Sequence, residues 1–259
     1  MGFAQTVILG AIAGLTIYLG LPLGRIRKIS TNMRTFLSMI SAGILLFLLL
    51  DIFSKLSEPI EAAISGGRNY GEFFVLLAIF IVGFGFGLMG LIAFDQRFLR
   101  LRPDANQAFA PTRLALMIAA GIGLHNFSEG LAIGQSSGRG EIAFAALLIV
   151  GFGLHNATEG FGIMGPLVGG DLPSWGFIGL TGLIGGGPTF LGTIVGYYFL
   201  STAMFVLFLA LAAGALVYII GELFNLNRRP GAKFPAGWGL FLGFLFGFLT
   251  DLILTIAGA

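Results

Sequence analysis

The chain has 259 residues, of which 56% are hydrophobic and only 10% are charged, and its formal net charge is +2. A water-soluble domain carries roughly a quarter charged residues, so this composition excludes an ordinary soluble domain. It predicts one integral membrane domain over residues 1–259. There is no cysteine, which excludes disulfides, iron–sulfur clusters and thiolate metal sites.

Long apolar runs recur along the whole chain, each close to the roughly 20 residues that cross the hydrocarbon core of a bilayer. In chain order they cover residues 4–23, 34–53, 73–94, 113–134, 142–164, 175–196, 200–223 and 238–257. The sequence therefore predicts an all-α, polytopic membrane protein with eight transmembrane helices. No positive segment precedes the first run, and it is longer than the apolar part of a signal peptide, so we expect it to be retained.

Basic residues concentrate in alternate predicted loops. Eleven of the fourteen Lys and Arg residues lie around the loops after the first, third and seventh helices: Arg25, Arg27, Lys28, Arg34, Arg97, Arg100, Arg102, Arg113, Arg228, Arg229 and Lys233. Positive loops stay in the cytoplasm, so we expect both termini on the extracellular or periplasmic side of the cytoplasmic membrane. The membrane orientation then explains why basic residues exceed acidic ones, and nucleic acid is not an expected partner.

Glycine is abundant, with 42 residues, and part of it is regularly spaced. Pairs or triplets four residues apart occur at 10 and 14, at 192 and 196, and at 239, 243 and 247. Small residues at this spacing let membrane helices approach closely, either within one bundle or at a dimer seam. The sequence Gly-Gly-Gly-Pro at 185–188 differs, because it predicts a broken or loosened helix at mid-membrane depth.

Two polar segments repeat inside the fourth and fifth predicted helices. They read Gly-Leu-His-Asn-Phe-Ser-Glu-Gly at 123–130 and Gly-Leu-His-Asn-Ala-Thr-Glu-Gly at 153–160, and they hold both histidines of the chain. In each copy His and Glu stand four residues apart, on one side of a helix and about 6 Å apart along its axis. Two such helices facing each other would bring together two imidazoles, two carboxylates and two amides.

Carboxylates at the centre of a bilayer are costly and mark ion or proton paths. No Lys or Arg lies at the predicted depth of Glu129 and Glu159, so we expect a proton or a bound cation to balance their charge. Imidazole nitrogen together with carboxylate oxygen suits Zn²⁺, Fe²⁺, Mn²⁺ or Co²⁺. The sequence thus predicts a divalent cation site at mid-membrane between these two helices.

His-Asn-x-x-Glu-Gly on the fourth helix, with a related motif on the fifth and eight spans, resembles the ZIP (Zrt-, Irt-like protein) family of divalent metal transporters. Residues 209–224 and 41–53 resemble that family's seventh and second helices. The resemblance implies transport of a divalent metal into the cytoplasm, with Zn²⁺ as first candidate and Fe²⁺, Mn²⁺, Co²⁺ or Cd²⁺ as others. It also implies a homodimer and a transporter rather than an enzyme, with no cofactor besides the cargo. The implied ligands are His125, Asn126, Glu129, His155, Asn156 and Glu159.

The chain departs from the family pattern in three places. Ser128 and Thr158 stand where relatives keep the proline before each glutamate, so hydroxyl bonds to the backbone could replace a proline kink. Gly187 stands where some relatives place a glutamate, and Asn156 occupies an often acidic position. A second adjacent site would lack these carboxylates, so we expect one bound cation.

Two other functions fit parts of the pattern. A redox membrane protein could use His125 and His155 as the axial ligands of one haem, although the glutamate one turn away on each helix would then have no role. A receptor or scaffold would leave the buried carboxylates without purpose.

Asp51 and Asp251 are expected near the outer helix ends, where they could attract cations or be ordinary interfacial residues. Glu222, near the cytoplasmic end, could act at the exit or be a solvated helix end.

Overall fold

The computed structural model describes residues 1–65, 69–99, 109–199 and 201–257, and over these residues the chain is helical without strands. Eight α-helices follow one another, with short 3-10 and π turns between some of them. They are α1 (Phe3–Leu15), α2 (Thr31–Ser65), α3 (Tyr70–Phe94), α4 (Phe109–Gly138), α5 (Ile142–Met164), α6 (Trp175–Tyr198), α7 (Thr202–Leu226) and α8 (Lys233–Ala257). The turns are η1 (Thr16–Leu19), η2 (Leu21–Arg25), η3 (Asp95–Leu99) and η4 (Gly165–Leu167).

The predicted eight helices are confirmed within the described residues, and seven of them are long and apolar enough to cross a membrane. The exception is α5, which is 23 residues long and carries the polar segment around His155. The chain is therefore a multi-pass helical membrane protein. Arg100 and Arg102, which the sequence placed in a basic loop, lie outside the described residues.

One boundary differs from the prediction in a way that matters for the site. The second helix was predicted over 34–53, but α2 runs from Thr31 to Ser65 and contains Pro59. At 1.5 Å per residue its 35 residues span about 50 Å, which exceeds the hydrocarbon thickness. Asp51 is therefore an internal residue of this helix rather than a residue at its outer end.

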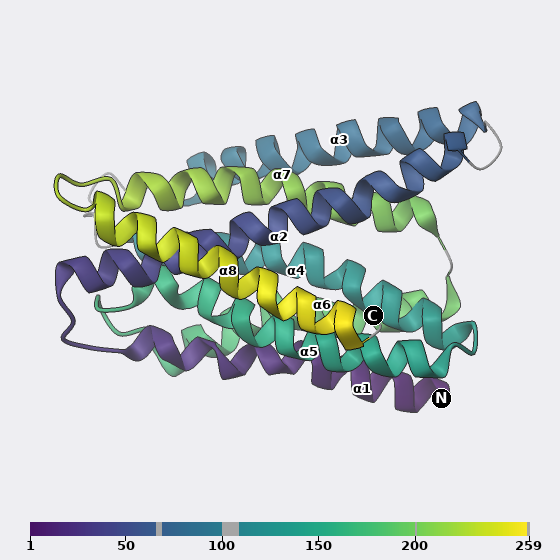
Figure 1. Cartoon of the computed structure of the whole chain (residues 1–259), viewed down its shortest axis with the longest axis horizontal. Helices are drawn as coiled ribbons and strands as arrows, with labels where there is room; N and C mark the ends of the chain where they lie inside the picture. Colours follow the sequence, from purple (N-terminus) through teal and green to yellow (C-terminus); the bar gives the residue numbers. More distant parts are fainter. Residues whose placement is uncertain (66–68, 100–108, 200, 258–259) are drawn as a thin grey trace.

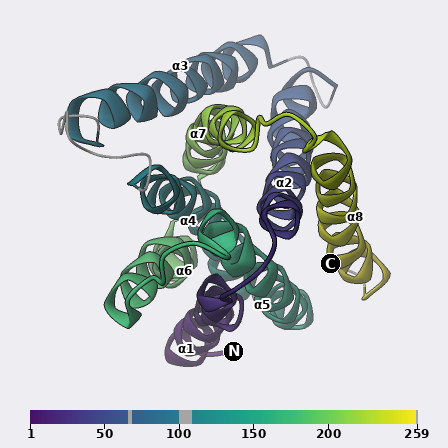
Figure 2. The ribbon, with the colours of Figure 1, turned by 90° about the vertical axis from the view of Figure 1, so that its left-hand side faces the viewer.

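The helices lie side by side along one axis, and both chain termini lie at the same end of the bundle (Figure 1). The α1–α2 and α7–α8 connections lie at the other end, as alternating helix directions require. Seen down the axis, α4 is central while α3 and α8 lie at the periphery (Figure 2). Of the most apolar window of each helix, 72% is buried in α4 but only 17% in α3 and in α8. The peripheral helices thus offer broad apolar faces to lipid.

Regularly spaced glycines bring the helix backbones into contact inside the bundle. A Cβ atom on Gly192 or Gly196 of α6 would collide with the Phe127 or Leu131 carbonyl oxygen of α4. Likewise Gly239 and Gly243 of α8 face carbonyl oxygens of α2. Of the two uses predicted for this spacing, packing within one bundle is therefore confirmed for these glycines.

The Gly-Gly-Gly-Pro segment does not break its helix, contrary to the sequence prediction. α6 continues from Trp175 to Tyr198 with Pro188 inside it. Proline removes the amide hydrogen that would bond to the carbonyl four residues earlier, which here is that of Ile184. A polar group of a neighbouring helix bonds to the adjacent carbonyl. The Asn126 side-chain amide of α4 donates to the Gly185 carbonyl oxygen at 3.0 Å.

A buried ion pair fastens α4 to η3, away from the polar repeat. Arg113 was assigned to a loop by sequence but lies inside α4, where its Nε is 3.0 Å from Asp95 Oδ1. Asp95 is fully buried and also accepts a hydrogen bond from the Tyr218 hydroxyl of α7. Glu222 joins the same group, 3.6 Å from an Arg113 nitrogen, so it does not lie at the polar repeat.

Replacing Arg113 with leucine should destabilise the protein by about 2 kcal/mol or more, because the buried Asp95 carboxylate loses its ion pair with Arg113. The measurement is the thermal unfolding midpoint of the purified protein in detergent. The matched control is Arg139→Leu, since Arg139 is exposed and surface changes stay within about 0.5 kcal/mol. Equal midpoints for the two variants would show that this ion pair contributes nothing.

Candidate metal centre

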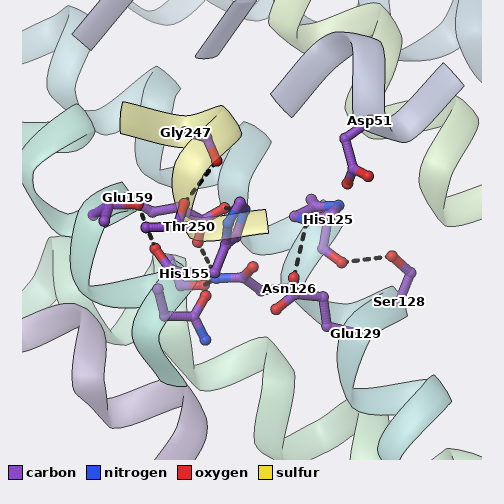
Figure 3. A network of polar contacts seen from close by, with 12 residues as sticks. Asp51, His125, Asn126, Ser128, Glu129, His155, Glu159, Gly247 and Thr250 are labelled. Atoms are coloured by element: carbon purple, nitrogen blue, oxygen red, sulfur yellow. Dashed lines mark hydrogen bonds and ion pairs between the residues drawn. The ribbon is translucent and has the colours of Figure 1, made fainter. Parts of the chain in front are cut away.

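The repeat places its six polar residues on facing helices in the interior of the bundle. His125, Asn126 and Glu129 lie on α4, and their counterparts His155, Asn156 and Glu159 lie on α5. None of the six is more than 5% exposed. Figure 3 shows the imidazoles and carboxylates of the two helices converging on one region. We call these six residues the polar cluster.

Three of the predicted ligands form a compact group. One candidate ligand atom from each of His125, Glu129 and His155 lies within 4.8 Å of the other two. Within α4, His125 Nε2 is 3.2 Å from Glu129 Oε1, the spacing that a four-residue separation on a helix allows. The two imidazole rings lie edge to face with centroids 6.1 Å apart. Two nitrogens and one oxygen thus surround a common space between α4 and α5.

Glu159 and Asn126 complete one side of this space. Glu159 is not part of the compact group, but its Oε1 lies 3.6 Å from His155 Nε2. Its other oxygen accepts a hydrogen bond of 3.0 Å from Asn126 Nδ2, which also donates to Gly185 of α6. Asn126 therefore connects three helices, and its amide hydrogens are used for this connection.

Asn156 is oriented differently from its counterpart on α4. Its Nδ2 donates to the Ala13 carbonyl oxygen of α1 at 3.0 Å, so its amide group connects α5 to α1. The equivalence that the sequence repeat suggested is therefore incomplete, because the two asparagines fasten different helices. Both amide oxygens remain without a hydrogen-bond partner.

Several buried atoms of the polar cluster lack hydrogen-bond partners. They are both ring nitrogens of His125, Nε2 of His155, the side-chain oxygens Oδ1 of Asn126 and Asn156, Oε2 of Glu129 and Oε1 of Glu159. An unsatisfied buried polar atom costs about 1–3 kcal/mol, so seven of them in one place would be a large penalty. One ring nitrogen of His125, Nε2 of His155 and a Glu129 oxygen can offer lone pairs to a single cation in the space between the two helices.

The hydroxyl residues that replace proline do bond to the backbone, as the sequence suggested. Ser128 Oγ donates to the His125 carbonyl oxygen at 2.6 Å, and Thr158 Oγ1 donates to the His155 carbonyl oxygen at 2.7 Å. Both bonds run back three residues within the turn that carries the histidine. The repeat thus preserves the same local backbone contact on both helices.

A basic residue lies closer to the carboxylates than the sequence suggested, although its ion-pair partner is Asp51 and not Glu129 or Glu159. Because α2 continues past residue 53, Lys55 lies on this helix, with its side chain 38% exposed and its Nζ 2.7 Å from Asp51 Oδ2. Lys55 interacts electrostatically with Glu129 of the polar cluster, and Asp51 interacts with His125 and His155. Figure 3 shows the Asp51 carboxylate beside His125. Asp251 of α8 interacts with both members of this pair.

A scan against protein-family models finds no match to the chain, and a search of curated proteins finds none either. Imidazole nitrogens and carboxylate oxygens without a thiolate are donors for borderline or hard divalent cations. Because these ligands are buried on membrane helices, a cation could reach them only along a path from the aqueous phase.

Proposed function

We propose that this protein carries a divalent metal cation across the cytoplasmic membrane through the polar cluster. The observation that supports the proposal best is the compact group of His125, Glu129 and His155, whose candidate ligand atoms lie within 4.8 Å of one another inside a membrane bundle. Membrane-buried ionisable residues usually line substrate or ion pathways. If the polar cluster were purely structural, its buried nitrogen and oxygen atoms without hydrogen-bond partners would have no explanation.

The donor set limits the candidate cations. Zn²⁺ accepts histidine nitrogen and carboxylate oxygen at about 2.0–2.2 Å and is the first candidate, while Fe²⁺, Mn²⁺, Co²⁺ and Cd²⁺ are the further ones. The resemblance of the repeat to the ZIP family adds the proposals of a homodimer and of transport into the cytoplasm. We propose one cation per chain, since Asn156 and Gly187 supply no carboxylate for a second site.

A cavity at the end of the bundle away from the termini supports release on that side. It has a volume of 690 Å³ and lies between α2, α4, η4 and α7, with Thr35, Ser38, Pro166 and Asn227 among its lining residues. The predicted orientation places this end in the cytoplasm. η4, which lines this cavity, directly follows α5, the helix that carries His155.

A haem between the two histidines fits the geometry less well. Glu129 Oε1 lies 3.2 Å from His125 Nε2, on the side of the ring where an iron atom would have to bind. A porphyrin would have to displace this carboxylate and separate α4 from α5. We therefore expect the purified protein to show no Soret absorption band, and a stoichiometric band would restore the haem hypothesis.

The function is tested by uptake of ⁶⁵Zn into proteoliposomes that contain the full chain, compared with protein-free liposomes. We expect saturable uptake that falls as the medium is acidified from about pH 7.5 to about pH 5.5, because protons compete with metal for imidazole and carboxylate. Uptake equal to that of protein-free liposomes at every pH, with each of the candidate metals, would refute the proposal.

A further inference from the structure

A charged pair from α2, Asp51 and Lys55, interacts electrostatically with the polar cluster. The Lys55 ammonium is 2.7 Å from the Asp51 carboxylate one helical turn earlier. The same ammonium lies 5.9 Å from the ring centroid of Phe152, which precedes His155 by three residues on α5. Residues three apart share a helix face, so the Lys55 side chain reaches the face of α5 that carries the imidazole.

The charge of Lys55 is shared among carboxylates from three helices. Besides Asp51, the groups with which its ammonium interacts electrostatically are Glu129 of α4 and Asp251 of α8. Among the described basic residues, Arg25, Arg113 and Arg229 instead have their partners at the end of the bundle away from the termini. Lys55 is thus a fixed positive charge beside a site whose ligands would attract a cation.

As an ion pair four residues apart with a Lys55 side chain that is 38% exposed, the pair would add little to stability. An ion pair between residues four apart on a helix contributes only about 0.3–0.5 kcal/mol wherever it is exposed. Next to a cation site the same ammonium has a larger consequence, because charges interact far more strongly in a partly buried, low-dielectric environment. It has no lone pair, so it cannot serve as a ligand.

We propose that Lys55 is a tethered cation that shares the acidic environment of the polar cluster with the transported metal and thereby limits its affinity. This inference rests on the proposed function. The ammonium engages Oδ2 of Asp51, which makes this carboxylate a weaker further ligand, and it repels the bound ion from one side. The site then holds one divalent cation weakly enough to release it, and Lys55 sets that affinity without touching the metal.

A series of charge variants tests this proposal by isothermal titration of zinc into the full chain in detergent. Removing the positive charge with Lys55→Met should tighten zinc binding by at least about tenfold. Asp51→Asn, which leaves the ammonium unbalanced, should weaken binding by about tenfold. The double variant should return to within about threefold of wild type, because the pair is neutral as a unit. Lys55→Arg should preserve the wild-type affinity.

Uptake by the same variants separates an affinity effect from damage. Lys55→Met should carry less zinc per second at saturating concentration, since tighter binding slows release. Unchanged or weaker zinc binding by Lys55→Met, in a protein whose wild type binds and transports zinc, would overturn the role of Lys55 but not the proposed function. If Lys55→Met does not fold, Asp51→Asn provides the test. Zinc binding by Asp51→Asn that is equal to or tighter than wild type would overturn the proposed role of Lys55. A wild type that neither binds nor transports any candidate metal would instead refute the proposed function itself.

Discussion

Replacing Glu129 or Glu159 with glutamine should reduce saturable zinc uptake by at least about 100-fold, because each change removes one negative charge from a buried donor set. Glutamine keeps the size and hydrogen-bonding ability of the side chain, so the helix contacts should persist. Glu129 belongs to the compact group of candidate ligand atoms, and its replacement should also abolish measurable zinc binding. Glu159 accepts its hydrogen bond from Asn126, which a glutamine oxygen can also accept.

The matched control for these variants is Glu141→Gln. Glu141 is exposed and directly precedes Ile142, the first residue of α5, so it offers the same chemical change away from the polar cluster. We expect wild-type uptake from this control. Wild-type uptake by both Glu129→Gln and Glu159→Gln, in protein that elutes as a single folded species, would exclude the polar cluster as the transport site.

Replacing Gly192 with alanine should lower the unfolding midpoint by about 10 °C, which corresponds to roughly 3 kcal/mol in a chain of this length. A Cβ atom at this position would collide with the Phe127 carbonyl oxygen and approach the Leu131 amide nitrogen of α4. These atoms are helix backbone and cannot rotate away, so α6 and α4 must separate. Because Phe127 and Leu131 flank Glu129, the separation should also weaken zinc binding.

Gly179→Ala provides the comparison on the same helix. A Cβ atom there would have no neighbour within 4 Å, so the substitution adds the same methyl group without a collision. Its intrinsic effect on α6 is a gain in helix propensity of up to about 1 kcal/mol. The two midpoints can be followed by the fluorescence of Trp175 and Trp238. An equal midpoint for both variants would contradict the close approach of α4 and α6.

The sequence could predict the eight helices because each is an apolar run set off by charged, glycine or proline residues. It could also predict which side chains meet, since His125 and Glu129 share a helix face whose pattern returns on α5. The backbone hydrogen bonds of Ser128 and Thr158 could be predicted from their positions three residues after each histidine. Each of these features depends on local spacing, which a single chain displays directly.

The position of Lys55 could not be predicted because hydropathy locates apolar residues rather than helix ends. Lys55, Glu58 and Glu61 made the segment after residue 53 resemble a loop, whereas α2 continues to Ser65. The different partners of Asn126 and Asn156 were also hidden, since they depend on the neighbours α6 and α1. The continuity of α6 through Pro188 was not predicted either, because a proline next to three glycines is typical of a helix break.

The most direct test of the central claim is X-ray absorption spectroscopy at the zinc edge on the zinc-loaded protein. We expect a first shell of nitrogen and oxygen at about 2.0–2.1 Å, with outer-shell scattering from two imidazoles. His155→Ala should lose the scattering of one imidazole, because its ring is one of the two that face the common space. A bound zinc ion without imidazole scattering, or a spectrum that is the same in His125→Ala and His155→Ala as in the wild type, would contradict a metal centre between α4 and α5.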